Sequence, residues 1–94
     1  MYYVYILSSK RNGTLYIGVT RNLIKRVHEH KSRFVSGFTK DYLVNMLVYY
    51  EETGNVHSAI EREKRLKRWK RCWKLELIEK SNPNWKDLYY DLIK

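Results

Sequence analysis

Two short runs of aromatic and β-branched residues near the N-terminus limit how this chain can fold. The first covers residues 1–7 and the second covers residues 15–20. Between them lies Asn12-Gly13, a dipeptide that favours a tight turn between paired strands. The first run is almost continuously apolar, as expected of a strand buried on both faces. The two runs therefore predict a β-hairpin whose first strand is central in a small sheet.

The rest of the chain predicts one further strand and several helices. A strand pattern covers residues 44–52, and helical patterns cover residues 23–31, 57–69, 70–80 after a bend, and 85–93. Thr20 or Asn22 can cap the first helix and Ser58 the second, because their side-chain oxygens accept hydrogen bonds from helical N–H groups. The polar, glycine-containing residues 32–41 predict a mobile loop.

The resulting order, β-β-α-β-α-α, predicts a protein of the α+β (mixed α/β) class. A length of 94 residues fits one compact domain, 1–94. The simplest sheet is small, three-stranded and antiparallel, in the order 2-1-3, and helices flank it. The third strand is then antiparallel to the first and parallel to the second. The helix between the second and third strands makes a right-handed crossover.

Charge and composition narrow the class of partner. A net charge of +9 points to a polyanion, nucleic acid first and an acidic membrane surface second. We find no apolar stretch of membrane-spanning length and no signal-peptide pattern. Cys72 is the only cysteine, which argues against a disulfide or a cysteine-rich zinc site and favours a reducing, cytoplasmic compartment. We therefore expect a nucleic-acid partner and no membrane association.

The most basic stretch is residues 62–74, in which eight of thirteen residues are lysine or arginine and two are tryptophan. Such a helix can contact phosphates, and its aromatic rings can stack on bases. The other interpretation is a solvated helix that buries two tryptophans in the core. The net charge favours the first interpretation. The predicted substrate-binding cations are Arg62, Arg65, Lys67, Arg68, Lys70 and Arg71.

Glu63 stands out within this basic stretch. On a helical wheel it lies beside the apolar positions Ala59 and Leu66, so its carboxylate is directed towards the protein body or a cleft. A desolvated carboxylate needs a partner, and a divalent metal ion is one. An ion pair with Lys67, four residues further on, is the alternative. The pattern leaves both interpretations open.

Two tyrosines and two residues of the first predicted helix are further candidates. Tyr5 and Tyr16 can be cross-strand neighbours, and a phenol can orient or deprotonate water if nearby cations lower its pKa from about 10. Arg26 can hold a phosphate, because a guanidinium stays charged and matches phosphate oxygens. His30 shares a helix face with Arg26 and can act as an acid or base near neutral pH. For all four, the alternative is an ordinary packing or surface role.

Together these residues resemble the motifs of the GIY-YIG nuclease superfamily. The resemblance rests on an ordered set of residues: Tyr3-Val4-Tyr5, Leu15-Tyr16-Ile17-Gly18, Asn22-Leu23, Arg26 and Glu63. It extends over nearly the whole chain and is closest to the short stand-alone GIY-YIG proteins of bacteria. The implied fold is a small antiparallel three-stranded sheet flanked by helices, which agrees with the element order above.

The resemblance also implies an activity, the hydrolysis of a DNA phosphodiester bond with one divalent ion, Mg²⁺ or Mn²⁺. Glu63 then corresponds to the metal-binding glutamate, and Tyr16 corresponds to the candidate general base. Tyr5 corresponds to the tyrosine that shapes the site, and Arg26 to the arginine that stabilises the charged transition state. Gly18 corresponds to the glycine that lets substrate approach the strand closely, since glycine has no Cβ. RNA stays open as a substrate.

Some positions depart from the family pattern. Tyr3 stands where the family name has glycine, Val19 where some members have lysine, and His30 where others have tyrosine. We expect no second domain, so target choice would come from the basic helix and residues 32–41, or from a protein partner. The prediction is an endonuclease, structure-selective and acting in repair or recombination. The alternative is a basic nucleic-acid-binding module with weak, lost or partner-dependent nuclease activity.

Overall fold

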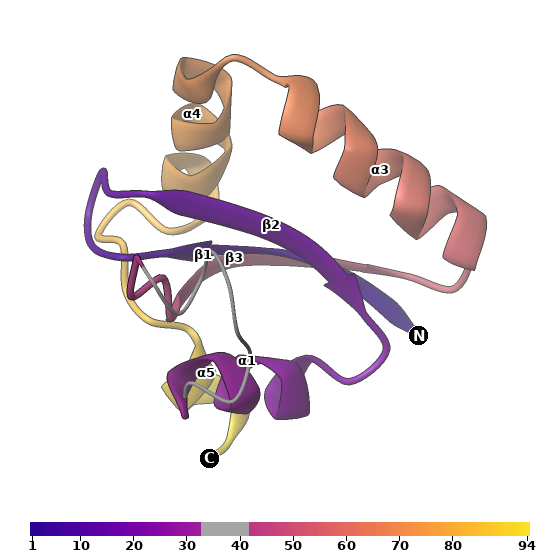
Figure 1. Ribbon diagram of the computed structural model, residues 1–94, viewed down its shortest axis with the longest axis horizontal. Helices are drawn as coiled ribbons and strands as arrows, with labels where there is room; N and C mark the ends of the chain where they lie inside the picture. The colour runs from indigo at the N-terminus through magenta and orange to yellow at the C-terminus, as the bar shows by residue number, and fades with distance from the viewer. Residues whose placement is uncertain (33–41) are drawn as a thin grey trace.

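The computed structural model describes residues 1–32 and 42–94, and the elements follow the predicted order. Residues 33–41, most of the predicted mobile loop, lie outside the described residues. Figure 1 shows one small sheet between two helical layers. The elements are β1 (Tyr2–Ser8), β2 (Leu15–Thr20), α1 (Leu23–Lys31), β3 (Met46–Thr53), α3 (Val56–Arg68), α4 (Arg71–Ser81) and α5 (Tyr89–Leu92).

The sheet has the strand order β2-β1-β3, and β1 pairs antiparallel with both neighbours. The predicted α+β fold with sheet order 2-1-3 is therefore confirmed. The third strand is also parallel to the second, because both run opposite to the central strand. A register shift interrupts the β1–β3 ladder between Ile6 and Leu7. Strand β2 remains an edge strand.

The sheet has an apolar core on each face. Val4 and Ile6 of β1 belong to the core beneath α3 and α4, whereas Tyr5 and Leu7 belong to the core that α1 and α5 cover (Figure 1). Each of these four side chains is at most 1% exposed. Successive residues of a strand point to opposite faces, so β1 supplies both cores. This confirms the prediction of a first strand buried on both faces.

The N-caps of α1 and α3 are asparagines. Oδ1 of Asn22 accepts a hydrogen bond from the backbone N–H of Lys25 at 3.1 Å, which confirms one of the two predicted caps of α1. Oδ1 of Asn55 accepts from the N–H groups of His57 and Ser58, at 2.8 and 3.1 Å. The prediction of Ser58 as the cap is wrong, because Ser58 lies inside the first turn that Asn55 caps.

The C-terminal segment differs from the prediction of a helix over residues 85–93. Only Tyr89–Leu92 is helical, and Trp85 has a φ of 53°, in the left-handed region. Two polar side chains compete with the helix for its backbone groups. Asn82 accepts from the N–H of Lys86, and Asp87 accepts from the N–H of Tyr89. The Trp85 ring is instead buried in the core beneath α3 and α4.

Asn82 joins this C-terminal segment to the sheet. Its amide nitrogen donates to the carbonyl oxygens of Val48 at 3.1 Å and Lys86 at 2.8 Å, and its Oδ1 accepts from the N–H of Lys86 at 2.9 Å. The side chain is buried, with 6% exposed. All these partners are main-chain groups, so one side chain fixes the path of the segment against the sheet. None of the helices in the described ranges is long and apolar enough to cross a membrane.

We predict that Asn82→Ala lowers the free energy of unfolding by about 2 to 3 kcal/mol, because the buried carbonyl group of Val48 and the part-buried backbone groups of Lys86 lose their hydrogen-bond partner. Urea denaturation followed by tryptophan fluorescence measures the change. Asn84→Ala is the matched control, since Asn84 is exposed two residues away. Equal stabilities of the two variants would contradict the structural role of Asn82.

Candidate functional site

The pairing of β1 and β2 brings the two candidate tyrosines together. Tyr5 lies opposite Gly18 in the ladder, and Leu7 lies opposite Tyr16. The tyrosines are therefore diagonal neighbours on one face, with ring centroids 6.4 Å apart. Both rings belong to the core that α1 covers. The predicted proximity of Tyr5 and Tyr16 is present, although they are not directly opposite each other.

Gly18 makes room for the side chain of Tyr5. A Cβ at position 18 would lie 2.5 Å from Oη and 2.6 Å from Cζ of Tyr5, closer than unbonded atoms can approach. The Tyr5 ring, which is 1% exposed, therefore extends across the backbone of the edge strand. This contact gives Gly18 a packing role. Its predicted role in admitting substrate stays a prediction.

Helix α1 adds Arg26 and His30, one turn apart, to the same cluster. His30 is 4% exposed, and its Nε2 lies 3.3 Å from the hydroxyl oxygen of Tyr5. The His30 ring also lies beside Tyr16, with centroids 5.5 Å apart. The Arg26 guanidinium hydrogen-bonds the same Tyr5 hydroxyl and pairs with Glu29 at 3.4 Å. The structure thus brings together four of the five predicted catalytic residues.

Burial sets the protonation states in this cluster. Burial raises the pKa of Tyr5 to about 12, and the hydrogen bond with Arg26 opposes the rise. Burial, and then the charge of Arg26, lowers the pKa of His30 to about 4. At neutral pH Tyr5 is therefore a neutral donor and His30 a neutral acceptor. The lowered pKa is at odds with the predicted role of His30 as an acid near neutral pH.

Arg26 keeps its charge at the edge of the cluster. Its pKa is raised, first by the hydrogen bond with Tyr5, and its side chain is 37% exposed. It lines an open hollow of about 350 Å³ with Lys25 and with Thr20 at the end of β2. A charged guanidinium anchored on one side and open to solvent on the other is suited to binding a phosphate.

Glu63 approaches from α3, on the other side of the sheet. Its side chain is 17% exposed, and Oε2 lies 3.6 Å from Nζ of Lys67. The ion pair with Lys67, which was the alternative to metal binding, is present. The Glu63 carboxylate is nevertheless largely shielded from solvent. The charge of Glu63 also contributes, after burial and Tyr16, to raising the pKa of Tyr5. The negative charge of Glu63 therefore acts on the Tyr5 hydroxyl, although the two residues come from different layers.

The residues fit a metal ion that keeps most of its water. Within residues 1–32 and 42–94, no group of three or more histidine, cysteine, aspartate or glutamate side chains could form a protein cage for an ion. Mg²⁺ is commonly bound by one or two carboxylates together with water and substrate phosphate oxygens. The shielded carboxylate of Glu63 is a donor of this type.

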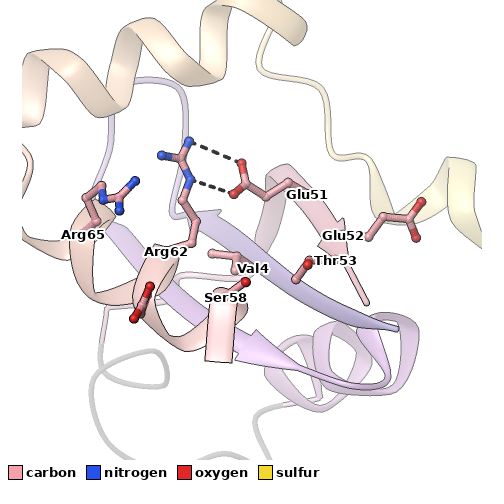
Figure 2. Close-up of a pocket in the computed structure, with 8 residues that line it drawn as sticks. Val4, Glu51, Glu52, Thr53, Ser58, Arg62 and Arg65 are labelled. Atoms are coloured by element: carbon pink, nitrogen blue, oxygen red, sulfur yellow. Dashed lines mark hydrogen bonds and ion pairs between the residues drawn. The ribbon is translucent and has the colours of Figure 1, made fainter. Parts of the chain in front are cut away.

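Two of the six predicted substrate-binding cations are used inside the molecule. Arg62 reaches from α3 to Glu51 on β3, with Nε 2.7 Å from Oε1 (Figure 2). Its guanidinium also lies over the ring of Trp69, 5.2 Å from the centroid. Arg71 donates to the carbonyl oxygens of Asn12 and Gly13, at 2.7 and 2.6 Å. Arg71 nevertheless remains exposed, as do the other four predicted cations: Arg65, Lys67, Arg68 and Lys70.

The hollow shown in Figure 2 lies between β3 and the first half of α3 and has a volume of about 300 Å³. None of the five predicted catalytic residues lines it. Sequence analysis missed Glu51, which accepts from Tyr49 and from Arg62 and so attaches α3 to the sheet. A carboxylate on a strand was the only signal, and it does not identify a partner eleven residues away.

We predict that Gly18→Ala lowers the free energy of unfolding by about 1 to 3 kcal/mol, the usual effect of overpacking, because its Cβ displaces the Tyr5 ring. Gly54→Ala is the control, since a Cβ there meets nothing within 4 Å. Urea denaturation of both variants measures the difference. A Gly18→Ala protein as stable as Gly54→Ala would show that Tyr5 can move without loss.

We predict an acid-dependent loss of stability from His30. Its pKa is lowered in the folded protein, so as the pH falls below 6.5 the unfolded chain binds the proton first and the free energy of unfolding decreases down to about pH 4. Between pH 7.5 and 5 the expected loss from this group is about 2 kcal/mol. The free energy of unfolding of His30→Gln should therefore decrease less than that of the wild type between pH 7.5 and 5.

The measurement is urea unfolding at the two pH values. His57→Gln, which alters an exposed histidine, should lose as much stability on acidification as the wild type. An unchanged pH dependence in His30→Gln would contradict the lowered pKa of His30.

Comparisons with known proteins agree with this geometry. The family model for the GIY-YIG catalytic domain matches residues 1–76. A UPF0213 protein of Syntrophus aciditrophicus is 39% identical over 82 residues, which cover 86% of this chain and 92% of that protein. A UPF0213 protein of Clostridium perfringens is 40% identical over 78 residues, which cover 83% of each chain.

A solved structure has the same fold. The solution NMR structure of a UPF0213 protein from Bacillus halodurans matches with a TM-score of 0.57 and 25% identity, and the match covers 93% of each chain. The resemblance drawn from the two tyrosine motifs, Arg26 and Glu63 is thereby confirmed at the level of the family. The chain belongs to the GIY-YIG family of nuclease-type catalytic domains, and its relatives within that family are the short UPF0213 proteins.

Proposed function

We propose that this protein is a divalent-metal-dependent endonuclease that hydrolyses phosphodiester bonds in DNA. The observation that carries the proposal is the cluster at the β2 edge, where Arg26, His30 and Tyr16 surround the hydroxyl of Tyr5. Such a cluster combines one fixed positive charge with neutral hydrogen-bonding groups. Both are needed where negative charge develops on a phosphate.

Arg26 is assigned to the scissile phosphate. The hydrogen bond with Tyr5 holds the guanidinium in one orientation and favours its charged form. A preorganised cation requires little rearrangement when charge accumulates on the phosphate oxygens during attack. Tyr5 and His30 are positioning residues in this proposal, since the Tyr5 hydroxyl accepts a hydrogen bond from Arg26 and donates its own proton to His30.

Tyr16 is assigned to the attacking water. Tyr5 is unsuited to act as the base, because burial raises its pKa to about 12 and it stays protonated at neutral pH. Tyr16 lies half-buried on the edge strand, so it is less fully covered than Tyr5. We propose that its phenol orients the water and accepts its proton.

Glu63 would hold the metal ion, Mg²⁺ or Mn²⁺, with water and phosphate oxygens as the other ligands. When bound, such an ion stabilises charge on a phosphoryl oxygen and lowers the pKa of coordinated water. The chain itself provides a shielded carboxylate whose cationic neighbour, Lys67, is 3.6 Å away. That separation leaves carboxylate oxygens accessible to a further cation.

The exposed cations of α3 and the following turn, Arg65, Lys67, Arg68 and Lys70, are proposed to contact the DNA backbone. Phosphate contacts give affinity but little sequence information. Cutting is therefore expected to follow DNA shape, as in repair or recombination in the cytoplasm, or to be directed by a protein partner. RNA is a possible second substrate for the same contacts.

We predict that Glu63→Gln abolishes cutting while DNA binding is kept, because the amide preserves shape but is a poor metal ligand. The assay measures nicking and cleavage of labelled duplex, single strand, flap, bubble and four-way junction with Mg²⁺ or Mn²⁺, and with EDTA as the metal-free control. Glu61→Gln is the matched variant, since Glu61 is an exposed glutamate of the same helix. It should cut at the wild-type rate.

Two other results would overturn the proposal in different ways. Equal cutting by wild type and Glu63→Gln would indicate a contaminating nuclease. No cutting of any substrate, together with binding that weakens steeply with salt, would favour the nucleic-acid-binding module. The net charge of +9 is the observation that favours this second function.

A further inference from the structure

A second cationic hollow lies between the edge strand β2 and the helices α3 and α4. Its volume is about 210 Å³, and it is lined by Leu15, Tyr16 and Ile17 of β2 with Lys67 of α3 and Lys74 of α4. This volume is below the range of about 300–1,000 Å³ typical of small-molecule pockets. Space of this size, bordered by two lysines, suits a small anionic group.

Lys74 is held in this hollow without a counter-ion. Its Nζ donates to the carbonyl oxygen of Lys67 at 3.3 Å, and burial, and then the charge of Arg71, lowers its pKa. In the part of the chain that the structure describes, no carboxylate lies within ion-pair distance of Lys74 or Arg71, and Glu63 reaches only Lys67. Positive charge therefore exceeds negative charge here, and an anion would relieve the imbalance.

The hollow has a counterpart at the other end of the same strand. Arg26 lines the hollow beside Val19 and Thr20, whereas Lys74 lines the one beside Leu15 and Tyr16. Figure 1 shows β2 as the edge strand between α3 and α4 on one side and α1 on the other. At about 3.3 Å per residue the two ends lie roughly 13 Å apart.

We propose that the hollow at Lys67 and Lys74 binds a backbone phosphate that flanks the phosphodiester bond held by Arg26. The nucleic-acid strand would then lie along β2, and Lys74 would be a positioning residue for it. The inference rests on the proposed function for the identity of its ligand. It adds a residue and a strand path that neither the motifs nor the family assignment provide.

The test measures binding in a background where cutting plays no part. Lys74→Gln is combined with Glu63→Gln in EDTA, and affinity for a labelled flap duplex is measured over a range of salt concentrations. We expect affinity to fall about fivefold at low salt and the slope of log affinity against log salt to decrease by about one, the value for one lost phosphate contact. Lys74→Arg should retain most of the affinity.

Lys80→Gln is the matched control, because it removes one exposed charge from the same helix away from the hollow. Equal affinities and salt slopes for Lys74→Gln and Lys80→Gln would overturn the proposal. The urea midpoint of each variant is measured alongside, so that a folding defect is not mistaken for lost binding. If no protein cuts DNA in the Glu63 experiment, the present test can still be carried out, because it measures DNA binding only.

A measurement on the DNA gives an independent result. Single methylphosphonate linkages remove one charge at a time along the strand beside the flap junction. At one position, the neutral linkage should lower the affinity of the wild type several-fold. At that same position it should not lower the affinity of Lys74→Gln any further. If both proteins show the same profile, no phosphate is held by Lys74 and the proposal fails.

Discussion

The burial of β1 on both faces is the constraint on which the rest of this structure depends. Consecutive residues of one strand enter two separate cores, so each helical layer is attached to the same seven residues. Arg26 and His30 arrive with one layer and Glu63 with the other. The sheet has one edge at β2 and the other at β3, and the proposed centre lies at the β2 edge. A small core thus supports groups that arrive from opposite faces of the sheet.

Desolvation also separates the chemical roles of residues that look equivalent in sequence. Tyr5 and Tyr16 differ because one ring is covered completely and the other is half-buried at the edge. Burial favours the neutral forms of both the Tyr5 phenol and the His30 imidazole, and the two groups hydrogen-bond to each other. The charge that remains belongs to Arg26, which no accessible pH removes.

Some of the polar residues of helix α3 hold the helix in place, while others are the proposed contacts to substrate. Arg62 turns towards β3 and pairs with Glu51, whereas its neighbour Glu63 lies on the side of β2 and Lys67. The Arg62 ion pair therefore restrains the rotation of the helix about its own axis, and so restrains the direction of the Glu63 carboxylate. Not every cation of this basic helix is therefore available to a partner, because Arg62 holds the helix in place.

The sequence by itself determined the hairpin, the strand order, the α1 cap at Asn22, and a motif set specific enough to identify the family. These follow from local periodicity, turn chemistry and residue order along the chain. Tertiary structure alone decided that Gly18 accommodates Tyr5, that Arg62 and Arg71 hydrogen-bond to other parts of the chain, and that Asn82 and Asp87 shorten the last helix. It also decided the direction in which the pKa values of Tyr5 and His30 move. Each of these depends on contacts or burial between residues distant in sequence, where periodicity carries no information.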